Sequence, residues 1–321
     1  MKIKKLLLEG HLFRYLIYKC IVCYRTIGEA VKFLILPKDR VILLWGHGES
    51  LNVGDAINLP IIEFLSGKRV VLAKYIRHSW LRSRVVYSAI GSIIQWSGDG
   101  CHIWGSGLIS PNAKVPRGCK VFAVRGPLTK QVMEDAGYAV PNIFGDPGVI
   151  LPIIYNPVRN GAFGKAVGLL PHYSDKYSAV VRRFRRSGFL FIDIEVGSRY
   201  AKVIDKIVNC DAIVTSSLHG LIFCHAYKVP VLWADFGGEI TGDGFKFRDY
   251  LLGVGIDLSP IKLTGYESID DLMEIIDLQE VSHDIQGLLD NCPFIDPNRK
   301  AMLSARLSTV INRDRNLALG G

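Results

Sequence analysis

The first 40 residues of this 321-residue chain are rich in apolar side chains but contain no long hydrophobic run. No uncharged stretch there exceeds five residues, whereas a transmembrane helix needs about 20 mostly apolar residues. The same segment lacks the compact apolar core and the small-residue cleavage site of a signal peptide. These absences exclude a conventional membrane span and a secretory signal from this part of the chain.

Cysteines are few and scattered. The seven thiols, without a secretory signal, predict a reducing compartment and free cysteines. Cys20 and Cys23 form a C-x-x-C pair with no second ligand pair, so we interpret them as buried thiols. No other residues have the spacing of metal ligands, and we expect neither a metal nor a cofactor.

Sequence motifs of the common nucleotide, zinc and serine-hydrolase sites are missing, including a Walker loop, G-x-G-x-x-G, H-E-x-x-H and G-x-S-x-G. The net charge of +9 is also uneven, because residues 1–40 hold nine Lys or Arg and three Asp or Glu. The other 281 residues hold 30 and 27, a balance of only +3. A nucleic-acid enzyme would carry a basic face on its folded body, so we expect no nucleic-acid partner.

The positive charge is concentrated in residues 1–38, where Lys or Arg interrupts apolar groups every few positions. This pattern predicts an amphipathic helix at a membrane surface, with its cations near anionic headgroups. A helix packed on the body of the protein or on a partner subunit is the alternative. We therefore expect a cytoplasmic protein that is peripheral on the inner face of the cell membrane.

After residue 38, short apolar strands alternate with helices, which predicts an α/β fold with parallel sheets. The expected strands are 41–45, 69–73, 101–104, 120–124, 142–144, 166–170, 189–193, 211–215 and 230–234. The expected helices are 55–66, 79–90, 127–136, 175–187, 198–209, 218–228 and 296–312.

Residues 152–165 are rich in Pro, Gly and Asn and show no periodicity, so we interpret them as an interdomain linker. Two Rossmann-like domains, 39–155 and 156–295, are expected to face each other across a cleft, each with its own core. Residues 296–321 are expected to contain a helix that can return to the first domain.

Polar turns follow several strands, at the ends where parallel sheets bind ligands. The most informative turn follows strand 211–215, where Ser216 and Ser217 can cap a helix whose first turn contains His219. An imidazole beside an anion site is a candidate acid or base. Other polar residues at such turns, or in the Gly-initiated segment 242–249, are Asn52, Asp55, Ser106, Arg125, Asp146, His172, Lys246 and Arg248.

Each of these residues also has a purely structural interpretation. Asp55 and Asp146 can act only as capping or turn residues, and Arg125 can be a solvent-exposed residue at a strand end. Lys246 and Arg248 can belong to a solvated face. We expect His225 to be a core histidine, and the sequence leaves the role of His47 open.

Seven of these segments, taken in order, resemble the polysaccharide pyruvyl transferase family over roughly residues 41–255. They are Asn52-Val-Gly-Asp55, Trp104-Gly-Ser-Gly107, Ala123-Val-Arg-Gly-Pro-Leu128, Gly145-Asp-Pro147, Pro171-His-Tyr173, Ser216-Ser-Leu-His-Gly-Leu221 and Phe245-Lys-Phe-Arg-Asp-Tyr250. The resemblance implies a GT-B-like pair of Rossmann-type domains. It also implies transfer of the pyruvyl group of phosphoenolpyruvate to two hydroxyls of a sugar, as a cyclic ketal, during synthesis of a surface polysaccharide such as an exopolysaccharide or capsule.

On this resemblance, His219 is expected to be the acid/base and His172 a second one, on the acceptor side. The residues expected to bind phosphoenolpyruvate are Arg125, Ser216, Ser217, Lys246 and Arg248. The weaker candidates for the site are Asn52, Asp55, Ser106 and Asp146. Together with the basic segment, the resemblance favours a lipid-linked sugar as acceptor. The acceptor's identity, the ketal stereochemistry and the oligomeric state are left open.

Two other functions compete with this one. A nucleotide-sugar glycosyltransferase of GT-B shape would use the same strand ends to bind a diphosphate. A non-catalytic membrane-associated scaffold of a polysaccharide assembly complex would keep the fold without the chemistry. The presence of both His219 and Arg125 argues against the scaffold, since a decayed site would be expected to lose one of them.

Overall fold

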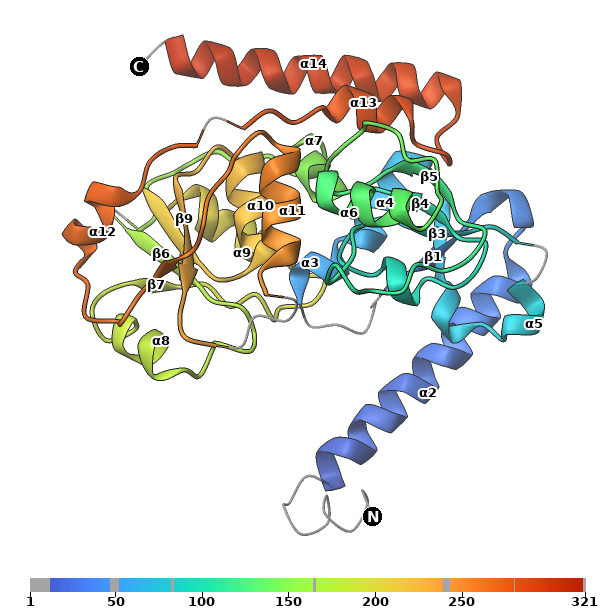
Figure 1. Cartoon of the computed structure of the whole chain (residues 1–321), viewed down its shortest axis with the longest axis horizontal. Helices are drawn as coiled ribbons and strands as arrows, with labels where there is room; N and C mark the ends of the chain where they lie inside the picture. The colour runs from blue at the N-terminus through green and yellow to red at the C-terminus, as the bar shows by residue number, and fades with distance from the viewer. Residues whose placement is uncertain are drawn as a thin grey trace.

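The computed structural model of the chain describes residues 12–46, 52–81, 84–163, 166–238, 243–279 and 281–319. Its framework is two parallel five-stranded sheets flanked by helices, an α/β fold (Figure 1). The first sheet has the order β2-β1-β3-β4-β5 and the second has the order β10-β9-β8-β6-β7. The α/β class with parallel sheets, predicted from the alternating pattern, is confirmed.

The strands of both sheets are short. Those of the first sheet are β1 (Val41–Trp45), β2 (Arg69–Leu72), β3 (Val86–Ser88), β4 (His102–Trp104) and β5 (Lys120–Ala123). Those of the second are β6 (Val167–Leu170), β7 (Leu190–Phe191), β8 (Ala212–Thr215), β9 (Val231–Asp235) and β10 (Ile261–Lys262). Every residue of β6 and β8 is buried, as expected for central strands covered on both faces.

The expected helix at 79–90 is wrong. The segment forms a one-turn helix, α5 (His78–Leu81), and then β3, which pairs with β1 on one side and β4 on the other. The β-branched and aromatic residues Val86 and Tyr87 suit this central strand position. The expected strand 142–144 is reduced to a single bridge between Val124 and Phe144.

Five other helices of the body lie within predicted helices and are shorter: α4 (Asn58–Ser66), α6 (Pro127–Asp135), α8 (Ala179–Phe184), α9 (Tyr200–Val208) and α10 (Leu218–Ala226). Helix α3 (Val53–Ala56) begins before the predicted start at residue 55, and four helices were not predicted: α7 (Leu151–Ile154), α11 (Phe245–Gly253), α12 (Ile269–Ile275) and α13 (Ile285–Asp290). Short 3-10 turns are η1 (Lys38–Arg40), η2 (Ala73–Tyr75), η3 (Ile94–Trp96) and η4 (Pro147–Ile150). Helix α4 ends at Gly67, whose φ of 66° is the left-handed conformation that favours glycine at this position.

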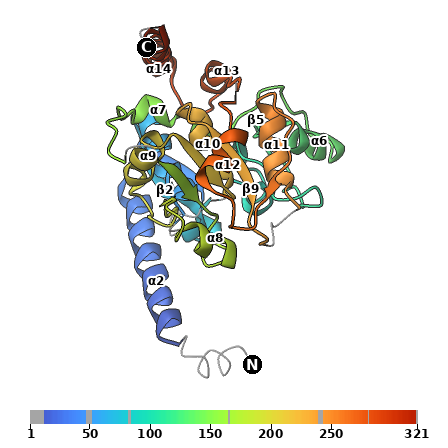
Figure 2. The same cartoon turned by 90° about the vertical axis from the view of Figure 1, so that its left-hand side faces the viewer.

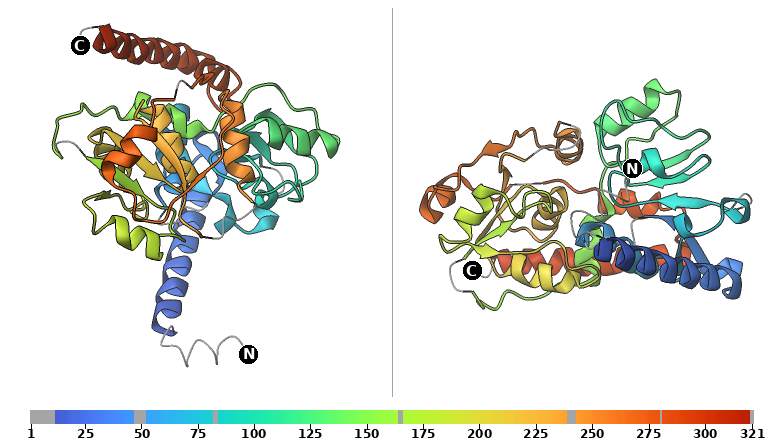
Figure 3. Two further views of the ribbon diagram at one scale, coloured as in Figure 1. Left: turned by 60° about the vertical axis from the view of Figure 1, so that its left-hand side comes forward. Right: turned by 90° about the horizontal axis from the view of Figure 1, so that it is seen from below.

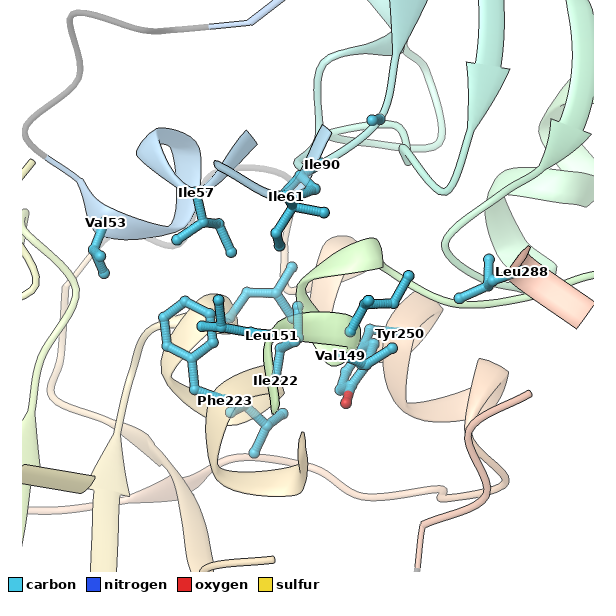
Figure 4. Close-up of a cluster of buried hydrophobic side chains, with 14 of the residues drawn as sticks. Val53, Ile57, Ile61, Ile90, Val149, Leu151, Ile222, Phe223, Tyr250 and Leu288 are labelled. Carbon is cyan, nitrogen blue, oxygen red and sulfur yellow. The ribbon is translucent and has the colours of Figure 1, made fainter. Parts of the chain in front are cut away.

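One hydrophobic cluster extends across both halves of the chain, residues 39–155 and 156–295, and other buried clusters lie within a single half. Ile57 and Ile61 of the first half pack with Leu151, and Ile222 and Phe223 of α10 complete the cluster (Figure 4). The segment η4–α7 lies between α4 and α10 and contacts both. The buried cluster continues to Tyr250 and Leu288. This continuous packing fixes the ligand-facing turns of one sheet against those of the other.

Two long helices border the body. The C-terminal α14 (Pro297–Leu319) contacts α4, α7 and α13, and the Arg299 guanidinium donates to the Leu65 carbonyl at 2.7 Å. The N-terminal α2 (Leu12–Ile35) extends away from the body on the side opposite α14 (Figures 2 and 3). Cys20 and Cys23 are exposed on α2, so their interpretation as buried thiols is wrong. The reason is that none of the described residues packs on this face of α2.

Candidate functional site

The candidate site is built on the turn between β8 and α10. Thr215 Oγ1 donates to the Leu170 carbonyl at 2.6 Å and accepts from the Ser217 amide at 3.0 Å, which fixes the turn to the neighbouring strand β6. Ser217 is the N-cap of α10, and its Oγ accepts from the Gly220 amide at 3.4 Å. The structure therefore confirms that Ser217 caps α10. The first-turn amides of α10 form the positive end of the helix dipole.

His219 lies in the first turn of α10 and is only 8% exposed. Its Nε2 is buried and has no hydrogen-bond partner among the described residues. Burial lowers the pKa of His219 to about 3, and the positive charges of Lys246 and Arg125 act in the same direction. The imidazole is thus neutral at physiological pH, and the hydrogen-bonding capacity of Nε2 is unused among the described residues.

Lys246 provides a second positive charge at the site, beside that of Arg125. It projects from α11, is partly buried, and its ammonium lies 5.5 Å from the Phe247 ring. Burial lowers the pKa of Lys246 to about 8, and the Arg125 charge lowers it further, while Asp55 and Asp175 oppose the shift. A buried ammonium with incomplete charge compensation favours the arrival of an anion.

Arg125 lies deeper in the protein than Lys246 and has no exposed surface. Its Nε donates to Asp249 Oδ2 at 2.9 Å, Nη1 to Ser92 Oγ, and Nη2 to the Leu108 carbonyl at 2.8 Å. A Cβ on Gly107 would lie 2.3 Å from Arg125 Cζ, so the guanidinium rests directly on this glycine. The solvent-exposed interpretation of Arg125 is wrong. The positive charge of Arg125 acts on the site electrostatically. Its N–H donors are engaged in hydrogen bonds to other groups of the protein.

Asp249 joins Arg125 to the helix that carries Lys246. Besides the arginine, it accepts hydrogen bonds from the Thr129 amide and hydroxyl, both at 2.7 Å. Arg125 and Asp249 are 124 residues apart and both are fully buried. Their pairing connects the β5–α6 turn of the first half with α11 of the second.

A second histidine borders the site in the loop after β6. The His172 amide donates to Ser216 Oγ at 2.9 Å, and Ser216 Oγ donates to Asp175 Oδ2 at 2.6 Å. Burial lowers the pKa of His172 to about 4, with Lys246 adding to the effect. Ser216 therefore links the two loops through its hydroxyl, and it holds His172 beside the first turn of α10.

The first half contributes the turn at 52–55. Asn52 caps α3 by accepting from the Gly54 amide at 2.9 Å, and the Val53 amide donates to the Ile194 carbonyl at 2.8 Å. A Cβ on Gly54 would lie 2.0 Å from His219 Nδ1. The turn is thus fastened to the second half and closes over His219.

Two buried or partly buried acids lie near the same turn. A Cβ on Gly91 would lie 3.7 Å from Asp55 Oδ1, and the Gly91 amide donates to Asp146 Oδ2 at 3.4 Å. Asp146 also accepts from the Gly148 amide at 2.8 Å and so caps η4. Burial raises the pKa of Asp146 to about 6, against the effect of these hydrogen bonds.

Two other predicted site residues have partners of their own. Ser106 is buried, its hydroxyl is 2.9 Å from that of Ser88, and its carbonyl accepts from the Arg125 amide at 3.1 Å. Arg248 is exposed, and its guanidinium lies 4.0 Å from Asp243. It is about 200° around α11 from Lys246. His47 lies outside the described residues.

His225 is a buried core histidine, as expected. Its Nδ1 is 3.0 Å from the Tyr250 hydroxyl and its Nε2 is 2.7 Å from Gln279 Oε1. Within the described ranges, no group of three or more His, Cys, Asp or Glu side chains could hold a metal ion.

Sequence reasoning did not select Asp175 and Asp249, although both fall in the polar segments that it identified. Each acts by pairing with a residue distant in the chain, Ser216 and Arg125 respectively. The spacing of residues along the chain contains no signal for such pairs. Together, the neutral His219, the charge of Lys246 and the start of α10 can bind an anion and move a proton next to it.

Comparison with known proteins agrees with this chemistry. The model of the polysaccharide pyruvyl transferase family matches residues 102–235, which confirms the resemblance seen in the sequence. The matched range contains Arg125, His172 and His219, and the segments Asn52–Asp55 and Phe245–Tyr250 lie outside it. The family indicates a transferase in polysaccharide biosynthesis. An uncharacterized protein of Acanthamoeba polyphaga mimivirus is 29% identical over 223 residues, which cover 67% of this chain and 75% of that protein.

Proposed function

We propose that the protein transfers the pyruvyl group of phosphoenolpyruvate to two hydroxyls of a sugar, forming a cyclic ketal and inorganic phosphate. The observation that carries the proposal is the unpartnered, buried Nε2 of His219 at the start of α10, within the field of Lys246. Phosphoenolpyruvate carries a phosphate and a carboxylate, and both suit fixed positive charge and helix N-terminal amides.

Lys246 is the direct cation for the donor in this proposal. The first-turn amides of α10 would hold one anionic group of phosphoenolpyruvate, next to the Ser217 cap. Arg125 would contribute through its charge, because its donors are engaged by Asp249, Ser92 and Leu108. Ser216 would act indirectly, since its hydroxyl already bridges Asp175 and His172.

The reaction requires one proton to reach C3 of the enol and two protons to leave sugar hydroxyls. Protonation of C3 makes C2 electrophilic, the first hydroxyl oxygen attacks C2, and the C2–O bond to phosphate breaks. The second hydroxyl oxygen then bonds to C2 and closes the ring. Of the two hydroxyl protons, one balances the new methyl group and the other leaves with phosphate. A general acid–base residue near C2 and C3 typically contributes about 10²–10⁴-fold to such a rate.

His219 is suited to this proton transfer because its pKa responds to the ligand. In the free site the imidazole is neutral and can accept a proton. An anion bound beside it would favour the protonated form and raise its pKa, so that the same ring could then donate. His172, on the neighbouring loop, is the candidate for deprotonating a sugar hydroxyl.

The proposal also includes the arrangement of the domains. Two Rossmann-like domains in a GT-B-like arrangement would place the donor on the second sheet and the acceptor on the first. The boundary would fall near residue 155, where α7 ends and a segment without strands or helices begins. The acceptor would be a lipid-linked sugar.

The test is phosphate release from phosphoenolpyruvate with a panel of lipid-linked and nucleotide-linked sugars, with the product mass followed in parallel. Release together with a mass gain of one pyruvic acid less one water, the increment of a pyruvyl ketal, would support the proposal and identify the acceptor. A nucleotide-sugar glycosyltransferase would also use a helix N-terminus and a lysine to bind a diphosphate. A protein that binds nucleotide sugars and not phosphoenolpyruvate would support that alternative. A folded protein that binds neither ligand would favour a non-catalytic scaffold.

A further inference from the structure

Helix α2 presents a continuous apolar stripe that no part of the described chain covers. Cys20 is exposed, and the apolar side chains that follow on this face are 81% (Tyr24), 60% (Ile27), 46% (Val31) and 66% (Leu34) exposed. These positions follow one another at intervals of four and three residues, which places them on one face of an α-helix. Isolated exposed apolar residues are ordinary, whereas a contiguous stripe marks an interaction surface.

The opposite face of α2 is fastened to the body. Glu29, nine residues after Cys20 and so about 180° around the helix, is only 7% exposed. Its carboxylate accepts from the Leu72 amide at 2.8 Å and from the Lys32 ammonium at 2.7 Å. Phe33 stacks on Trp80 with 6.1 Å between the ring centroids. The body thus holds the helix in a fixed rotation, with the exposed stripe on the side away from these contacts.

In the portion of the chain that the structure describes, no helix has both the length and the apolar character to cross a bilayer. An amphipathic helix with cations beside its apolar face instead lies in the plane of a membrane interface, with the apolar side chains among the acyl chains.

The charge of α2 favours a membrane over a second copy of the chain as the partner that covers the stripe. The sequence of α2 has four cations, Arg14, Lys19, Arg25 and Lys32, and one acid, the buried Glu29 that pairs with Lys32, so the helix has a net charge of +3. A two-stranded coiled coil needs acidic residues beside the seam to pair with such cations. Two copies of α2 would bring like charges together, whereas an anionic headgroup layer compensates them.

We propose that the exposed stripe of α2 docks the protein on the surface of an anionic lipid bilayer. The apolar side chains insert at the headgroup–acyl boundary, and the net positive charge of the helix favours an anionic headgroup layer. Because Glu29 and Phe33 fix the helix to the first half, the bilayer holds the whole catalytic body in one orientation. This inference does not depend on the proposed pyruvyl transfer, although a membrane-bound acceptor would make the two complementary.

The test is flotation of the full chain with vesicles of phosphatidylcholine alone and of phosphatidylcholine with phosphatidylglycerol. The variant is Ile27→Asp with Leu34→Asp. Its control, Val158→Asp with Leu278→Asp, has the same charge change at side chains that are 65% and 56% exposed on the body. We expect binding to the anionic vesicles, weakening at high salt as the Debye length shortens. In the α2 variant the partition coefficient should fall about tenfold or more, and in the control it should stay unchanged.

Two results would overturn the proposal. One is a wild-type chain that does not float with anionic vesicles, or an α2 variant that floats as well as the wild type. The other is a concentration-dependent dimer in sedimentation that the α2 variant abolishes, without vesicle binding by the wild type, which would make the stripe a self-association seam. Thermal unfolding of both variants tests whether they fold. Activity on a water-soluble acceptor is measured separately, so a failure of docking and a failure of the proposed reaction are distinguished.

Discussion

Gly54 and His219 lie against each other, although they belong to opposite halves of the chain. The α-carbon of Gly54 is so close to the imidazole that a Cβ there would lie 2.0 Å from Nδ1 and 2.6 Å from Cε1. The ring is held on its other side by α10, which carries it. The absence of a side chain at position 54 is therefore a requirement for the observed position of His219.

Gly54→Ala should displace His219 and lower kcat by about 10²-fold, since a shift of about 1 Å at a catalytic group can cost that much. The measurement is steady-state phosphate release, with phosphoenolpyruvate affinity from a binding titration. Gly28→Ala is the control, because Gly28 is also helical and a Cβ there meets nothing within 4 Å. Equal kcat in the Gly54→Ala variant and the wild type would show that His219 needs no fixed position.

His219→Ala should lower kcat by about 10²–10⁴-fold and weaken phosphoenolpyruvate binding far less, because the imidazole of the free site is neutral. His225→Ala is the matched control on the same helix. His225 pairs with Tyr250 and Gln279, so its loss should reduce thermal stability and leave the per-molecule turnover of the folded protein intact. A parallel loss of donor binding in His219→Ala would assign His219 to anchoring the donor.

Arg125→Ala should destabilise the fold strongly, by about 3–5 kcal/mol, because it leaves the Asp249 carboxylate buried without its counter-charge. Urea unfolding measures this loss. Arg117→Ala removes an exposed partner of Asp99 and should change stability little, since exposed ion pairs contribute little. A stable Arg125→Ala protein with weak donor binding would instead favour direct contact between Arg125 and the substrate.

Donor affinity should fall as the pH rises through about 8 in the wild-type protein. Burial lowers the pKa of Lys246 to about 8, so its ammonium is present below that pH and is lost above it. The bound anion would move this transition upward in the complex. Lys246→Arg keeps the charge at all these pH values and should remove the alkaline loss, whereas Lys246→Ala should bind weakly throughout.

Calorimetric titration of phosphoenolpyruvate between pH 6 and pH 10 makes this comparison. Arg248→Ala serves as the control, because Arg248 lies on the other side of α11 beside Asp243. If donor affinity fell in the same way at alkaline pH in the wild type and in Lys246→Arg, Lys246 would be excluded as the titrating group.

Much of the fold was accessible from the sequence because its signals are local. The apolar runs of β6 and β8, the proline that opens α6 and the glycine that ends α4 each act within a few residues. The strand β3 was missed for the opposite reason. Three residues carry too little periodicity, and β3 forms because β1 and β4 pair with it on either side.

The candidate site, like the fold, has features that the local sequence predicts and features that only the tertiary structure shows. The sequence by itself determined an α/β chain with parallel sheets, polar turns after the strands, a histidine at the start of a helix and a basic N-terminal segment. Only the tertiary structure decided that Asp249 neutralises Arg125, that Gly54 leaves room for His219, and that Cys20 lies on an exposed face of α2. The physical reason is the separation along the chain of the residues that interact. Helix caps and apolar periodicity act between near neighbours, whereas burial, charge pairing and close packing depend on residues that come together only when the chain folds.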